Sequence, residues 1–70
     1  MKILAERLHS LRKERNLTQA DISKEIDISL NSYRRYERNE REPDAPTLAR
    51  MADFYGVTLD YLVGRSEERG

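Results

Sequence analysis

The stretch LTQADISKEIDISLNSYRRYERN, which spans residues 17–39, decides the fold of this chain. It opens with the start signal of a short helix, because the hydroxyl of Thr18 can cap the first turn and Asp21 completes a near capping box. Ile22 and the isoleucine four residues later form an apolar stripe at helical spacing. Asp27 ends this helix, since Asp tolerates the left-handed backbone conformation better than most residues other than glycine.

A second helix follows almost at once. We expect it to run from about Leu30 to Arg38, with Ser29 as its cap and Asn39 as its stop. Only about three residues turn the chain between the two helices, and so short a connection suits a helix-turn-helix corner. Ser23 lies on the first helix where the second would cross closely, and its small side chain fits either that crossing or an exposed position.

The helix over residues 30–38 has two chemically different faces when its side chains are placed at about 100° per residue. Tyr33 and Tyr36 share one face, which we expect to be buried. The opposite face contains no glutamate. A solvated charged face is one interpretation of this pattern. The other is DNA contact, because Arg and Asn make bidentate contacts with base edges in the major groove. The residues of this face are Asn31, Arg34, Arg35 and Arg38.

The rest of the chain also shows helical spacing and no convincing strand pattern. Leucines at i, i+4 and i+7 predict a first helix over about residues 3–15, and Asn16 is a plausible left-handed stop for it. Asp44 is expected to cap a fourth helix that Gly56 closes, with a one-turn fifth helix after it. The sequence therefore predicts an all-α fold of five short helices. The predicted organisation is one domain over residues 1–64 and a disordered tail over residues 65–70.

Composition excludes several classes of function. The chain has 70 residues, enough for one domain, and contains no cysteine, so disulfides and thiolate metal sites are excluded. The single histidine, His9, excludes histidine-cluster metal sites, and we expect a surface histidine with no catalytic role. No nucleotide or nucleophile motif and no membrane span is present. The expected protein is cytoplasmic, is not an enzyme, and has no metal or other cofactor.

The charge is unevenly distributed along the chain. Lys plus Arg and Asp plus Glu each number 13, so the net charge is zero. Residues 1–42 have 10 basic and 8 acidic residues, whereas residues 43–70 have 3 and 5. Within residues 28–41 the counts are 4 and 2. Because screening acts over about 10 Å at ordinary salt, this local excess is what a phosphate backbone would meet.

The stretch from residue 8 to residue 62 resembles the Cro/C1-type helix-turn-helix family of bacterial and phage regulators. The resemblance is carried by LTQ at residues 17–19, RYE at 35–37, REP at 41–43 and GVTLDYL at 56–62. Each motif is weak alone, but the order and spacing are specific. The resemblance implies a compact five-helix domain whose third helix enters the major groove of double-stranded DNA.

The resemblance also implies roles for individual residues. Arg12 and Glu37 match a partly buried ion pair that orients the first helix against the third more than it stabilises the fold. Asp27 and Asn39 depart from the family, which favours glycine at these two turns, and the apolar Leu30 makes the base preference harder to predict. The implied base-reading residues are Leu30, Asn31, Arg34 and Arg35. The implied DNA-backbone contacts are Gln19, Ser29, Arg38, Asn39 and Arg41.

These patterns favour a sequence-specific DNA-binding transcriptional repressor that acts as a homodimer, because one short helix reads few base pairs. The alternative is a protein-interaction module on the same fold, such as an antitoxin-like partner, which the zero net charge keeps open. Tyr33, Tyr36 and Tyr55 are expected in the core. Phe54 and Tyr61 fit either a partner surface or a partly exposed edge of that core.

Overall fold

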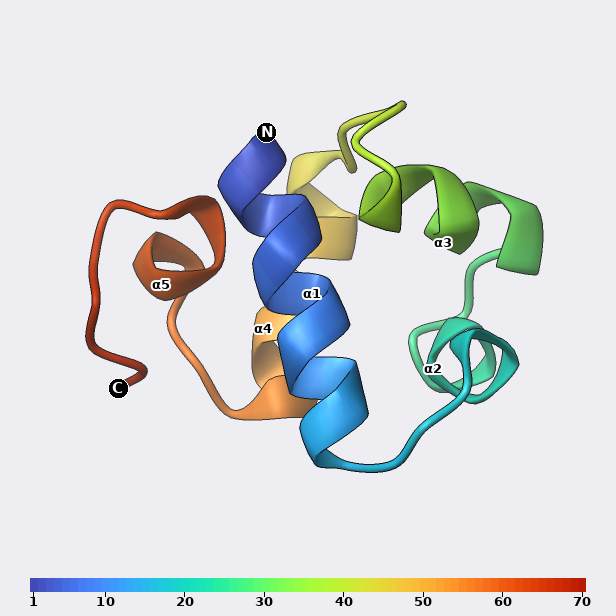
Figure 1. Ribbon diagram of the computed structural model, residues 1–70, viewed down its shortest axis with the longest axis horizontal. Coiled ribbons are helices and arrows are strands. Elements are labelled where there is room, and N and C mark those ends of the chain that lie inside the picture. Colours follow the sequence, from blue (N-terminus) through green and yellow to red (C-terminus); the bar gives the residue numbers. More distant parts are fainter.

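The computed structural model describes residues 1–70 and contains five α-helices and no strand (Figure 1). The predicted all-α class is therefore confirmed, and the predicted helix ends lie within a residue or two of the observed ones. None of the helices has the length and apolar character needed to span a bilayer. The helices are α1 (Lys2–Glu14), α2 (Gln19–Glu25), α3 (Leu30–Glu37), α4 (Ala45–Tyr55) and α5 (Leu59–Val63).

Side-chain caps start the helices where the sequence predicts them. The Thr18 hydroxyl accepts from the backbone N–H of Asp21 at 3.0 Å, and the Asp21 carboxylate accepts from the backbone N–H of Thr18 at 2.9 Å. This is a complete capping box at the start of α2. Ser29 caps α3 and Asp44 caps α4 in the same way, each accepting from the N–H three residues on. The predicted caps are confirmed.

Three turns depend on a left-handed residue that is not glycine. Asn16, Asp27 and Asn39 have φ angles of 56°, 57° and 58°. They follow α1, α2 and α3 respectively, so each lets the chain leave a helix abruptly. The turn at Asp27 separates α2 from α3 by only four residues, which sets these two helices as a helix-turn-helix corner.

The core forms around α1, which passes between α5 on one side and the α2–α3 corner on the other (Figure 1). The tyrosines predicted to be buried lie in it, with Tyr33 fully enclosed. Ser23 is 5% exposed, so the close crossing of α2 and α3 is the correct alternative for this residue. Leu48 is partly buried and packs against the edge of the core. The core residues are Leu4, Leu8, Leu11, Ile22, Ile26, Tyr33, Tyr36, Met51, Ala52, Tyr55 and Leu62.

Arginine side chains close the end of the molecule formed by α5 and residues 65–70. The guanidinium of Arg7 lies 3.9 Å from the centroid of the Tyr61 ring and donates to the carbonyl oxygens of Tyr61 and Ser66. Arg69 makes two bonds with the Glu14 carboxylate, at 2.6 and 2.9 Å. The disorder predicted for residues 65–70 stays a prediction. The segment contains no helix, and these contacts connect it to α1 and α5.

Phe54 and Tyr61, for which the sequence allowed either a partner surface or an edge of the core, are partly buried. The Phe54 ring packs edge-on against Tyr55 with a centroid distance of 5.2 Å, and its backbone carbonyl accepts from Arg15 at 2.9 Å. Tyr61 lies against Arg7, and the guanidinium of Arg69 is 5.5 Å from its ring centroid. Both rings are therefore edges of the core covered by arginine side chains.

Candidate nucleic-acid interface

The outward face of α3 is a row of basic side chains with no partner in the protein. Tyr33 and Tyr36 are buried, at 0% and 7% exposure, and they fix the rotation of the helix. The opposite residues are all exposed. None of the three arginines there forms an ion pair or a side-chain hydrogen bond within the chain. The exposed residues are Asn31, Arg34, Arg35 and Arg38.

The start of α3 is shaped by Ser29 and Leu30. The Ser29 hydroxyl accepts from the backbone N–H of Ser32 at 3.1 Å and lies 2.9 Å from the Ser32 hydroxyl. Ser29 is exposed, whereas Leu30 is half-buried. Leu30 therefore combines a packing contact with partial access to the surface from which the α3 arginines project.

The loop from Asn39 to Pro43 is anchored at both ends. Pro43 is buried, and the Asn39 side-chain oxygen accepts from the amino group of Met1 at 2.9 Å. The same amino group lies 2.9 Å from the Glu42 carboxylate. Arg41 is exposed and unpaired between these anchors. The loop therefore presents one cation and the remaining amide group of Asn39 beside the end of α3.

A buried polar network ties α3 to α1 and α2. Arg12 donates from Nε to Glu37 Oε2 at 2.7 Å and from Nη2 to Oε1 at 3.1 Å, so the expected ion pair is present and bidentate. The two side chains are 9% and 5% exposed. Arg12 also donates to the carbonyl oxygen of Leu17 at 3.0 Å. Gln19 donates to Glu37 Oε1 at 3.2 Å, which connects the first residue of α2 to the last residue of α3.

The network sets the ionisation of its members. Burial opposes the charged form of Glu37, but the hydrogen bonds from Arg12 and Gln19, together with the nearby Tyr33 hydroxyl, outweigh it and hold the pKa of Glu37 below its ordinary value. The bond to Glu37 raises the pKa of Arg12. Burial raises the pKa of Tyr33 and also that of Tyr55, and neither buried hydroxyl has a partner at full hydrogen-bond geometry. The network is therefore ionic at one end and neutral at the other.

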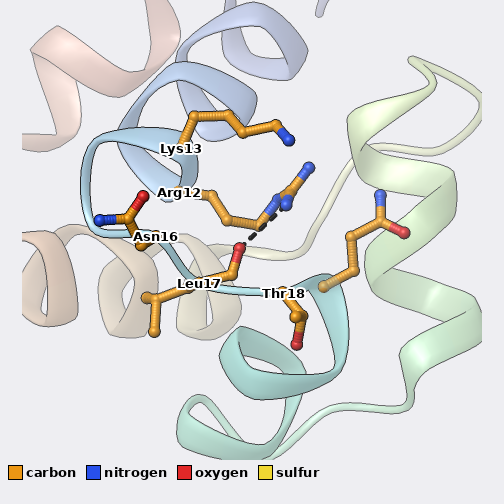
Figure 2. A pocket seen from close by; sticks show the side chains of 6 residues that line it. Arg12, Lys13, Asn16, Leu17 and Thr18 are labelled. Carbon is orange, nitrogen blue, oxygen red and sulfur yellow. Dashed lines mark hydrogen bonds between the residues drawn. The ribbon is translucent and has the colours of Figure 1, made fainter.

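An open hollow lies where α1 turns into α2, next to this network. Its volume is about 580 Å³. Figure 2 shows the side chains of Arg12 and Lys13 extending from α1 to the same side, above the turn that contains Asn16 and Leu17. Lys13 has no ion pair, so the hollow has a positive charge beside the donor groups of its rim. The lining residues are Arg12, Lys13, Asn16, Leu17, Thr18 and Gln19.

Two features of the region around this hollow and the neighbouring ion pair were not predicted from the sequence. One is Lys13, which follows Arg12 directly and could have been found as a second basic residue at the end of α1. The other is the position of His9. It is a surface residue as expected, with a side chain 55% exposed, but its Nδ1 lies 3.3 Å from both Glu37 Oε1 and Arg12 Nη2. Its spacing of three residues from Arg12 was the available signal.

The structure thus brings the predicted site residues onto connected surfaces. The basic face of α3 and the loop after it adjoin, and Gln19 is bonded to the end of α3. Figure 1 shows α2 and α3 together toward one end of the longest axis, with α5 at the other end. Their roles toward DNA stay predictions. The members of this surface, called the α3 surface below, are Gln19, Ser29, Leu30, Asn31, Arg34, Arg35, Arg38, Asn39 and Arg41.

Comparison with known proteins identifies the family. The chain is 36% identical over 64 residues to the HTH-type transcriptional regulator ImmR of Bacillus subtilis (strain 168). The aligned residues are 91% of this chain and 50% of the relative. The chain is 46% identical over 62 residues to the cryptic phage CTXphi transcriptional repressor RstR of Vibrio cholerae serotype O1 (strain ATCC 39315 / El Tor Inaba N16961), covering 89% and 55%. No solved structure matches significantly.

The chain spans about half the length of these relatives. The profile of the helix-turn-helix family matches residues 8–62, which includes all of α2, α3 and α4 and most of α1 and α5. The match therefore covers the corner, most of the core and the basic face of α3 described above, and this chain belongs to the helix-turn-helix family.

Proposed function

We propose that this chain is a sequence-specific DNA-binding transcriptional regulator and acts as a repressor in the cytoplasm. The observation that carries the proposal is the α3 helix, with its tyrosines buried and its arginines left without a protein partner. A helix of this width fits the major groove of B-DNA, and guanidinium and amide groups match the donor and acceptor pattern of guanine and adenine there. Two relatives are named as a transcriptional regulator and a phage repressor.

Each part of the α3 surface has a distinct role in this proposal. The side chains along the exposed face of α3 read base edges, and those that flank the helix contact phosphate and fix the register. Gln19 has two roles in this proposal. One hydrogen of its amide group is donated to Glu37, and the other is free for a phosphate oxygen. The base-reading residues are Leu30, Asn31, Arg34 and Arg35. The backbone contacts are Gln19, Ser29, Arg38, Asn39 and Arg41.

The active species in this proposal is a homodimer on a pseudo-palindromic operator. The longest extent of the Cα trace is 27 Å, and it contains a single α3. Successive major-groove faces are about 34 Å apart along DNA, so one copy cannot place helices in two of them. Two copies related by a twofold axis supply both helices and double the number of bases read.

Salt titration tests the proposal. Affinity for genomic DNA fragments is expected to fall steeply as salt rises, because phosphate contacts release counterions. The Arg41→Ala variant should weaken binding to all sequences alike and reduce the slope of log K against log salt by about 1. Arg65→Ala is the matched control, since Arg65 is an exposed arginine two residues after the end of α5. Binding that is undetectable or insensitive to salt would instead favour a protein-interaction module.

A further inference from the structure

Three nitrogen atoms compete for one oxygen of the buried Glu37 carboxylate. Arg12 Nη2 lies 3.1 Å from Oε1, Gln19 Nε2 lies 3.2 Å from it, and His9 Nδ1 lies 3.3 Å from it. The other oxygen, Oε2, is 2.7 Å from Arg12 Nε. A carboxylate oxygen has two lone pairs, so Oε1 cannot bond all three groups equally well. The state of His9 therefore bears on the bond that holds Gln19.

His9 can occupy this position in two ways. When the imidazole is neutral with a free lone pair on Nδ1, that atom accepts from Arg12 Nη2 at 3.3 Å and leaves Glu37 to Gln19. When the imidazole is protonated, Nδ1 can only donate, and its available acceptor is Glu37 Oε1. Because the imidazolium and the carboxylate are both charged, this bond adds a Coulomb attraction that the neutral amide of Gln19 does not supply. Protonation therefore shifts Oε1 away from Gln19.

The His9 ring is exposed to solvent and lies near polar groups from three helices. Its side chain is 55% exposed, so solvent reaches it directly. α3 presents the Glu37 carboxylate, and α2 presents the neutral amide of Gln19. Its own helix presents Arg12, together with Glu6 and Lys13 one turn away on either side, both exposed. An imidazole ordinarily changes its charge between about pH 5 and pH 8.

We propose that His9 is a positioning residue that makes DNA binding by this chain tighter as the pH falls from about 8 to about 5.5. Protonation adds a positive charge beside Arg12, which is one of the residues that line the hollow between α1 and α2. It also frees the amide hydrogen that Gln19 gives to Glu37, so that both amide hydrogens can be donated to phosphate oxygens. Both changes strengthen contact with the DNA backbone, and together they raise affinity about two- to fivefold. This inference rests on the proposed function.

The test compares the affinity of three proteins for DNA at about pH 8 and at about pH 5.5. The probe is a fluorescein-labelled duplex of about 30 base pairs of mixed sequence, followed by anisotropy at constant ionic strength. The unmodified chain should bind about two- to fivefold more tightly at the lower pH. In His9→Gln, which cannot be protonated, the ratio of the two affinities should fall to the value set by the other groups of the protein. In His9→Lys, which is charged at both pH values, the ratio should fall to the same value.

The chain is well suited to this comparison because it contains a single histidine. Any other group whose charge differs between the two pH values is common to all three proteins, so the difference between their ratios isolates His9. Circular dichroism checks that each variant is folded at both pH values. A second measurement follows the ring protons of His9 by NMR. By linkage, the midpoint of their titration should move to higher pH when the duplex is added. The acid dissociation constant of the ring should fall by the same factor as the affinity rises.

Two results separate the failure of this inference from the failure of the proposed function. If the unmodified chain and His9→Gln bind the duplex with the same ratio, and the duplex leaves the His9 midpoint unchanged, His9 is not coupled to DNA and the inference is wrong. If none of the three proteins binds the duplex at either pH in low salt, the proposed function itself is wrong. An unequal ratio together with a raised midpoint supports both.

Discussion

Outside the α3 surface most arginine side chains are bound to the protein, whereas the arginines of the α3 surface are exposed to solvent. Arg7 and Arg15 each donate to two backbone carbonyl oxygens, and Arg69 pairs with Glu14. The four arginines of the α3 surface have no such partner. The comparison shows that neither the number of arginines nor the net charge of zero reveals where DNA would bind. The unpartnered arginines of the α3 surface are Arg34, Arg35, Arg38 and Arg41.

Arg12 is bound to Glu37 of α3, and its replacement should give the largest change in the free energy of unfolding. Arg12→Ala leaves the buried carboxylate of Glu37 uncompensated, which should lower the free energy of unfolding by about 3–5 kcal/mol. Urea denaturation followed by circular dichroism measures this loss. The control is the double replacement Arg12→Met with Glu37→Leu, which removes both charges and should recover much of the stability. A loss below about 1 kcal/mol in the single variant would show that solvent reaches Glu37 easily.

Acid should weaken the same ion pair without any mutation. The pKa of Glu37 is lower in the folded protein than in the unfolded chain, so its contribution is complete above about pH 4.5 and is lost as the pH falls through the folded value. The free energy of unfolding should therefore fall below that pH. The Glu37→Gln variant has no carboxylate at this position, and its acid dependence should be shallower. Parallel profiles for the two proteins would contradict the assignment.

Arg35 tests the opposite side of the comparison. Arg35→Ala should lower affinity for the preferred duplex by about 1–3 kcal/mol and relax the preference at one base position. Because Arg35 has no partner in the protein, thermal unfolding should be unchanged. The preferred duplex comes from selection out of a random pool, which also reports the symmetry and spacing of half-sites. Unchanged affinity would show that this residue does not face the bases.

Arg15 gives the converse result and the smallest effect. Its guanidinium donates to the carbonyl oxygens of Phe54 and Tyr55 at 2.9 Å each, at the end of α4. Arg15→Ala should lower the free energy of unfolding by about 1–2 kcal/mol, the value of two such bonds near the surface. DNA affinity measured well below the melting temperature should not change. A loss of affinity in a folded Arg15→Ala protein would mean that the two classes of arginine are not distinct.

Local chemistry accounts for the parts of the fold that the sequence predicts. The Thr18–Asp21 capping box and the left-handed Asn16 and Asp27 are decided within three or four residues, so their residue types suffice. The two faces of α3 follow from helical spacing in the same way. The bidentate pair of Arg12 with Glu37 came from the family resemblance, because 25 residues separate its members.

Contacts between distant segments account for what the sequence could not predict. His9 meets Glu37 across 28 residues, and Arg69 meets Glu14 across 55. Neither pair has a local pattern, since both depend on how α1 lies against α3 and against residues 65–70. Ser23 was ambiguous for the same reason: its burial is decided by the distance between α2 and α3 and not by its neighbours in sequence.

The left-handed turns at Asn16 and Asp27 leave room for engineering. Neither side chain forms a hydrogen bond in the structure, so each position retains the steric cost of its Cβ without a compensating contact. Glycine at either position would remove that cost, about 1 kcal/mol per site, less the greater freedom of the unfolded chain. A scaffold made more robust in this way would tolerate extensive rewriting of α3, and its base preference could then be reprogrammed with less risk of unfolding.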